Sequence, residues 1–308
     1  MAVRGWAGSV ATAIGGAACA SAAQLGLGYG LGVVTWQPVT AAPGEAIWVA
    51  SLAWTTWIAA TATVLGAVCA DRLSAWGDQR EGTESTLASV LWRIVLAAAA
   101  AVGALVTVVL VAIPARAAER ADTFSPQTIA AGYAALGVLL GLLVAVWAVA
   151  ARAVATNVLV TTGWLWLVAI VAAVDDVLAG HGPAGAQLGV WQAASGDGFW
   201  LRNIYLPGAA LTLGSAAVIG VFAAWRSARR SDSRVGTAVS GGIGPLLVAA
   251  AYFLAAPSLV GVRAEQLSAH LVAPYAVIAG LAGSVLVTAL GQRAATQRAA
   301  ASAEPAVP

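Results

Sequence analysis

The sequence predicts an all-α membrane protein, a polytopic bundle of about eight transmembrane helices. Two observations carry this prediction: 60% of the 308 residues are apolar, and only 9% are charged. Soluble domains carry about 25% charged residues, so this chain cannot cover itself with a charged surface and needs lipid as its solvent. The apolar residues also gather into long runs, and a run of about 20 is enough to cross a bilayer.

Eight apolar segments alternate with short connectors that carry the proline, glycine and charge. The predicted spans are 7–33, 46–69, 94–113, 127–150, 155–174, 207–225, 237–257 and 269–291. We expect residues 1–292 to form a single transmembrane domain. The alanine-rich remainder, 293–308, is expected to be a disordered cytoplasmic tail.

The arginines predict the orientation of the bundle. All 15 basic residues are Arg, and with the N-terminus inside, 11 of them lie on the inner side and 4 on the outer side. Cytoplasmic loops carry an excess of basic residues, so both termini are expected in the cytoplasm. The absence of Lys and the abundance of Ala and Gly are typical of a GC-rich bacterial genome. We therefore expect a multi-pass protein of the bacterial plasma (inner) membrane.

The first span contains a glycine at every second position: Gly26, Gly28, Gly30 and Gly32. This spacing differs from G-x-G-x-x-G, and no strand precedes it, so a nucleotide-binding loop is excluded. In a helix, the first and third of these glycines form one G-x-x-x-G pair, and the second and fourth form another on a nearly opposite face. We expect the first helix to pack between two neighbouring helices through these glycines.

Polar and helix-breaking residues inside the spans indicate a candidate substrate path. Gln24 is more polar than the threonines that lie deep in the spans, and it suits either a pore lining or a bond between helices. The run GGIGP in the seventh span contributes Gly241, Gly242, Gly244 and Pro245. Glycine weakens a helix and proline removes a backbone donor, so the run predicts a kink or an unwound turn. Broken helices bind substrate in several transporter folds, whereas a kink without a ligand is the alternative.

The only two histidines, His181 and His270, fall on the outer side of the predicted topology, together with Asp175 and Asp176. Imidazole and carboxylate groups are suitable ligands for zinc or another divalent ion. The spacing of these four residues matches no known metal site, so the alternative is that they are solvated loop residues. They are the metal-ligand candidates of this sequence, and no cofactor is expected.

The longest connection, residues 180–206, contains four aromatic residues scattered among glycines. Such a segment either lies on the outer bilayer surface as an anchor or folds over the mouth of the bundle as a lid. We expect the interfacial anchor.

The motifs that carry enzyme chemistry are absent from the sequence, among them G-x-x-x-x-G-K-[ST], H-E-x-x-H, C-x-x-C and G-x-S-x-G. No ionisable residue is predicted well inside a span, which disfavours ion-coupled transport. We expect a non-enzymatic transporter or permease-like protein for an apolar or neutral solute. The alternatives are a membrane scaffold, assembly or signalling partner subunit and, with less support, an intramembrane metal-dependent enzyme. The expected partners are the lipid bilayer and other membrane-protein subunits or a homo-oligomer, and no nucleic acid.

Overall fold

The computed structural model describes residues 5–36, 38, 42–75, 86–118, 124–179, 187–191, 197–230, 234–259 and 262–303. The elements in chain order are α1 (Trp6–Gly30), α2 (Ala42–Ala75), α3 (Thr86–Ala104), α4 (Val106–Ala115), η1 (Arg116–Ala118), α5 (Pro126–Ala150), α6 (Arg152–Leu178), η2 (Asp197–Phe199), β1 (Trp200–Leu201), β2 (Ile204–Tyr205), α7 (Leu206–Arg229), α8 (Arg234–Val239), η3 (Ser240–Gly242), α9 (Ile243–Ala255) and α10 (Ala264–Ala303). Within this described part, eight helical segments are long and apolar enough to cross a membrane. This agrees with the predicted multi-pass helical bundle.

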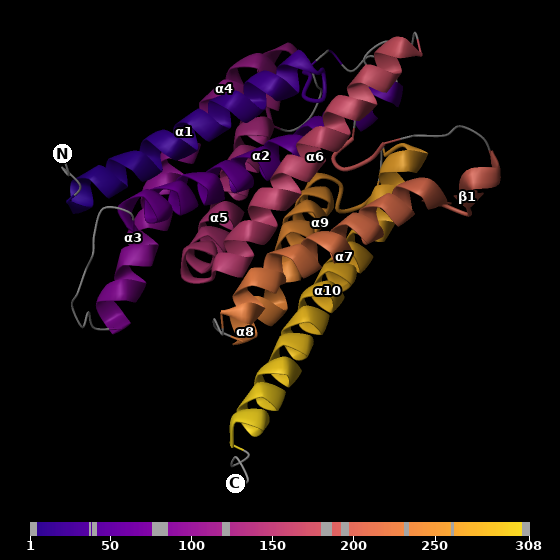
Figure 1. Ribbon diagram of the computed structural model, residues 1–308. Helices are drawn as coiled ribbons and strands as arrows, with labels where there is room; N and C mark the ends of the chain where they lie inside the picture. The colour runs from indigo at the N-terminus through magenta and orange to yellow at the C-terminus, as the bar shows by residue number, and fades with distance from the viewer. Residues whose placement is uncertain are drawn as a thin grey trace.

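Each predicted span overlaps one of these eight segments, and the largest difference lies at the C-terminal end of the chain. The final helix, α10, continues to Ala303 and projects beyond the rest of the bundle (Figure 1). Residues 293–303 are therefore helical, in contrast to the predicted disordered tail, because alanine has the highest helix propensity of all residues. Residues 304–308 lie outside the described part.

Local sequence explains where several helices start. Proline occupies the first turn of α5 and of α7, where its missing N–H costs nothing because the first N–H groups of a helix have no intrahelical partner. Only one residue, Ala151, separates α5 from α6, and its extended backbone (φ −130°, ψ 109°) turns the chain between the two helices. The two helices are consequently joined without a loop.

Several arginines that the topology prediction placed on the inner side come together in the fold. Asp71, in the last turns of α2, interacts electrostatically with arginines of α2, α3 and α6, namely Arg72, Arg93 and Arg152. This end of the bundle thus gathers positive charge from segments far apart in the sequence. The direction in which the bundle sits in a membrane remains a prediction.

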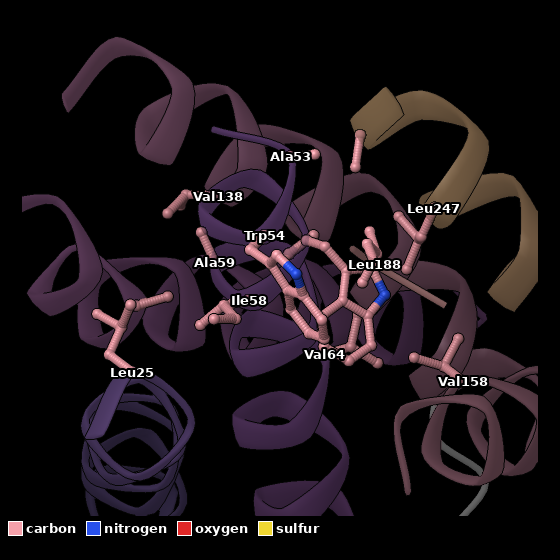
Figure 2. Packing of buried hydrophobic residues seen from close by; sticks show 14 of the residues in the cluster. Leu25, Ala53, Trp54, Ile58, Ala59, Val64, Val138, Val158, Leu188 and Leu247 are labelled. Atoms are coloured by element: carbon pink, nitrogen blue, oxygen red, sulfur yellow. The ribbon is translucent and has the colours of Figure 1, made fainter. Parts of the chain in front are cut away.

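The centre of the bundle is α2, which contacts α1, α3, α5, α6 and α9. In its apolar window 89% of the residues are buried, the highest share of the eight segments. Trp54 and Trp57 of α2 are almost fully buried and stack with Trp166 of α6, with ring centroids 5.1 to 6.1 Å apart across the two helices. Figure 2 shows Trp54 in the middle of this core, with Leu25 of α1 on one side and Leu247 of α9 on the other.

The first helix packs through only part of the glycine pattern, at Gly28. A methyl group on Gly26 or Gly30 would meet no described atom within 4 Å, and Gly32 lies past the helix end in a left-handed turn (φ 71°). The buried stripe instead runs along Ala13, Ala17 and neighbouring small residues, which lie against α2 at Gly66. Helix α1 contacts neighbouring helices, chiefly α2 and α3, but of the four glycines of the pattern only Gly28 is buried in a contact. Because α1 carries small residues on more than one of its faces, the sequence alone did not show which face packs closely against other helices.

The contrast between Gly28 and Gly30 gives a direct test of this packing. A Cβ on Gly28 would lie 3.2 Å from Val34 Cγ2 and 3.6 Å from Trp166 Cη2, whereas Gly30 faces open space. Gly28→Leu is expected to destabilise the protein by about 1–3 kcal/mol through overpacking. Gly30→Leu is expected to change stability by less than about 0.5 kcal/mol. Thermal unfolding in detergent measures both, and equal loss in the two variants would contradict the packing described here.

Candidate functional site

The interruption predicted from the run GGIGP is present in the seventh span. The helix α8 passes into a 3₁₀ turn, η3, over Ser240–Gly242 before α9 begins at Ile243. Pro245 lies in the first turn of α9, where proline is tolerated, and it lacks the N–H that a continuous helix would pair with an earlier carbonyl. The interruption exposes backbone groups that need partners from other helices.

Those partners come from the side chain of Asn157 on α6. The N–H of Gly244 donates to Asn157 Oδ1 (2.7 Å), and Asn157 Nδ2 donates to the carbonyl oxygen of Gly241 (3.3 Å). The side chain is fully buried, and its amide takes the place of the missing turn of backbone hydrogen bonds. Asn157 therefore holds the interruption in place from across the helix interface.

A second support comes from α10. The N–H of Gly241 donates to Ser284 Oγ (3.2 Å), and the Ser284 hydroxyl donates to the carbonyl oxygen of Ala238 (2.5 Å). The backbones also approach closely here, since a methyl group on Gly241 would overlap the carbonyl oxygen of Gly280, and one on Gly280 would overlap that of Gly241. Only glycine fits at this crossing, because each backbone occupies the space of the other's side chain.

A cavity of about 50 Å³ lies beside the interruption, enclosed by α6, α7, α9, α10 and the segment 187–191. A volume of this size holds a few water molecules or a small solute. Most of the lining is apolar, and the polar side chains are Thr161 of α6, Thr212 and Ser215 of α7, and Tyr252 of α9. The Thr161 hydroxyl is buried and has no hydrogen-bond partner among the described residues. Pro245 forms part of the wall, so the cavity touches the interrupted helix directly.

The segment 187–191 forms one wall of this cavity. Leu188 is 1% exposed, and its carbonyl oxygen accepts a hydrogen bond from the Tyr252 hydroxyl. Gly189 adopts a left-handed backbone (φ 72°), and a Cβ there would lie 3.1 Å from Leu165 Cδ2. Leu188 and Gly189 of the long connection therefore lie against the bundle and line the cavity, whereas the surface anchor expected for residues 180–206 stays a prediction. We call residues 187–191 the roof of the cavity.

Gln24 lies in the core and does not line the cavity. Its Oε1 accepts hydrogen bonds from Thr61 Oγ1 (3.1 Å) and Trp166 Nε1 (3.0 Å), which tie α1 to α2 and α6. The structure therefore separates Gln24 from the residues of the interruption, although both belong to the predicted substrate path. Of the four residues predicted from GGIGP, Pro245 lines the cavity and Gly241, Gly242 and Gly244 build the turn beside it.

Of the two histidines, the structure describes His270. His270 is 1% exposed, and both ring nitrogens lie within hydrogen-bond distance of backbone carbonyl oxygens, so it is neither a solvated loop residue nor free to bind a metal. Asp175 is exposed and accepts a hydrogen bond from Trp191 Nε1 (3.3 Å). His181 lies outside the described residues. Among the residues described, no cluster of three or more His, Cys, Asp or Glu residues could hold a metal ion.

Asn157 is the functional candidate that the sequence prediction missed. The available signal was a single amide side chain in an otherwise apolar run, but its partners lie 84 and 87 residues away in the chain. The chain matches no protein-family model, no curated protein and no solved structure.

Proposed function

We propose that this multi-pass protein is a non-enzymatic, permease-like transporter for an apolar or neutral solute, with the cavity between α6, α7, α9 and α10 as its solute site. One observation carries the proposal: the cavity lies against an interrupted helix whose turn is held by Asn157. Interrupted helices beside a cavity form solute sites in several transporter folds. Pro245 lines the cavity, and the preceding residue, Gly244, donates a hydrogen bond to Asn157. The cavity and the interruption therefore share the first turn of α9.

The lining favours an uncharged solute. Among the described residues that line the cavity there is no Asp, Glu, Lys, Arg or His, and a charged ligand in such surroundings would lose its hydration without compensation. The Thr161 hydroxyl, which has no hydrogen-bond partner among the described residues, provides one hydrogen-bonding group within an apolar wall. This combination suits a small molecule with an apolar body and a small neutral polar end. In the proposed orientation, with both termini in the cytoplasm of a bacterial cell, the roof lies on the outer side of the cavity.

The alternative is a membrane scaffold, assembly or signalling partner subunit. It is favoured by the outward face of α1, where Gly26 and Gly30 are uncovered and a second helix would find room for close backbone contact. A partner subunit or a second copy of the chain would then cover this face. An intramembrane metal-dependent enzyme has no comparable support, because His270 is committed to backbone carbonyls.

Filling the cavity tests the transporter proposal. Ala273 lines the cavity from α10, and Ala273→Trp is expected to block it. In proteoliposomes, the wild-type protein is expected to speed the flux of an uncharged probe with an apolar body, such as 1,2-hexanediol, above that of protein-free vesicles. The variant is expected to return the flux to the protein-free level. Stopped-flow light scattering measures this flux.

Leu143→Trp is the matched control, because Leu143 is 71% exposed on α5 and a larger side chain there faces lipid. This control is expected to retain the wild-type flux. If the wild-type protein does not increase the flux of 1,2-hexanediol or glycerol, and instead purifies in a fixed ratio with another membrane protein, the partner role replaces the transporter.

A further inference from the structure

Two neighbouring helices, α7 and α10, carry exposed arginines at the same level of the bundle. Arg226 and Arg229 lie in the last turn of α7. Ala228 of that turn lies against α10, because a Cβ on Gly291 would be 3.3 Å from Ala228 Cβ. Arg293, two residues further along α10, is therefore level with the arginines of α7, although it is distant from them in the chain.

No described carboxylate balances these arginines. Among the described residues of α7, α8, α9 and α10 the only acidic one is Glu265, in the first turn of α10 at the other end of that helix. Asp232 and Glu304 lie outside the described residues. The arginines near Asp71 differ, because they share that carboxylate. The described part of the α7 and α10 pair thus carries an excess of positive charge at this end.

The helix dipole explains only part of this charge. The unpaired carbonyls in the last turn of a helix favour basic side chains, which accounts for Arg226 and Arg229 of α7. The same reason does not apply to Arg293, because α10 continues as a helix to Ala303. Arg293 therefore adds positive charge that no helix end balances.

An exposed apolar stripe on α7 leads directly to Arg229. Its members follow the spacing of one helix face: Val218, Phe222, Trp225 and Arg229. The first three are 47–67% exposed, and the Arg229 guanidinium carbon lies 4.5 Å from the centre of the Trp225 ring. Tryptophan prefers the boundary between hydrocarbon and lipid headgroups, so this cation–π contact places Arg229 at the level of the headgroups.

Helix α10 has the same arrangement beside it. Leu286, Leu290 and Arg293 share one face of the helix, and both leucines are more than half exposed. Helices α7 and α10 pack along each other (Figure 1). Two apolar stripes that face lipid therefore end in arginine on neighbouring helices.

We propose that Arg229 and Arg293 bind the phosphate of an anionic phospholipid whose acyl chains lie along the exposed stripes of α7 and α10. A guanidinium group forms paired hydrogen bonds with phosphate oxygens, and the stripes provide apolar contact for the chains. A free phosphate ion would have no use for the stripes, which is why the site is assigned to a lipid. The inference is independent of the proposed transport and of the side of the membrane that this end faces.

Native mass spectrometry tests the lipid preference. The protein is equilibrated in detergent with equal amounts of phosphatidylglycerol and phosphatidylcholine that have the same acyl chains. The wild-type protein is expected to retain phosphatidylglycerol preferentially. A basic residue near an anionic headgroup contributes about fivefold to binding. The double variant Arg229→Gln, Arg293→Gln is therefore expected to lower the ratio of phosphatidylglycerol-bound to phosphatidylcholine-bound protein by about 10–30-fold.

The matched control is the double variant Arg116→Gln, Arg202→Gln, which removes the same charge from two exposed positions. Arg202 precedes the first turn of α7, at the opposite end of that helix from Arg229. The control is expected to keep the wild-type ratio. An equal loss in both double variants would show general attraction between charges, and equal retention of the two lipids by the wild-type protein would show no preference. Either result would overturn the site.

Two further measurements distinguish a lipid from a free anion and binding from folding. Glycerol 1-phosphate, which carries the phosphate without acyl chains, is expected to leave the ratio unchanged at a concentration equal to that of the lipid. Displacement of phosphatidylglycerol by this compound would overturn the lipid assignment. Phosphatidylglycerol is also expected to raise the thermal unfolding temperature of the wild-type protein by about 2–4 °C more than phosphatidylcholine does. The same shift with both lipids would count against the site, and neither measurement depends on a variant or on solute flux.

Discussion

Asn157→Ala is expected to lower the free energy of unfolding by about 2–4 kcal/mol. The substitution leaves the N–H of Gly244 and the carbonyl oxygen of Gly241 without partners in an apolar interior, and each such group costs about 1–3 kcal/mol. Hydrogen bonds between membrane helices average only about 0.6 kcal/mol, because side chains usually find other partners. Backbone groups at a helix interruption cannot do so, and we therefore expect a value above that average. Unfolding in detergent, followed by tryptophan fluorescence, measures the loss.

Thr162→Ala on the same helix is the matched control. Thr162 is also buried, but among the described residues its hydroxyl bonds only to the carbonyl oxygen of Val158 within α6 (2.8 Å). Its loss is expected to cost less than about 1 kcal/mol, since that carbonyl keeps its place in the helix ladder. If the two variants lose the same stability, Asn157 does not support the interruption.

Gly280→Ala is expected to cost about 3 kcal/mol or to prevent folding. A Cβ at this position would overlap the carbonyl oxygen of Gly241, and the obstacle is backbone rather than the end of a flexible side chain. Overpacking in a well-filled core costs about 1–3 kcal/mol, and the upper end applies where neither helix can yield. Gly241→Ala is expected to have a similar effect, because the overlap is mutual. The yield of monodisperse protein and its thermal unfolding temperature measure both.

Gly214→Ala is the control for this crossing. Gly214 lies on α7, which packs along α10, yet a methyl group there would meet no described atom within 4 Å. Replacing an exposed helical glycine by alanine is expected to leave stability unchanged or raise it by up to about 1 kcal/mol. A comparable loss in Gly214→Ala and Gly280→Ala would mean that the helices do not cross as described.

The sequence predicted those features that depend on local properties of the chain. Hydrophobicity sets the span of each helix, so the eight segments could be read without knowing their neighbours. The run GGIGP interrupts its own helix, because glycine and proline act on the backbone at their own positions. The candidate site was therefore predicted in part, at the interruption and at Pro245.

The features that the sequence did not predict depend on which helices pack against one another. Asn157 owes its role to backbone partners that lie 84 and 87 residues away in the chain, and the same residue would have no such role in a different packing arrangement. The uncovered glycines of α1 illustrate the same point, because small residues occupy more than one face of this helix. A repeat of small residues shows that close packing is possible, and the arrangement of the whole bundle selects the face that is used.

The single residue between α5 and α6 restricts how the protein can be inserted into a membrane. A connection of one residue is too short for the second helix to begin on the opposite surface, so the two helices cross the bilayer in opposite directions as a hairpin. The orientation of α5 thus determines that of α6, and Arg152 stays at the surface where the hairpin turns. For this pair of spans, biogenesis therefore involves one choice of direction rather than two.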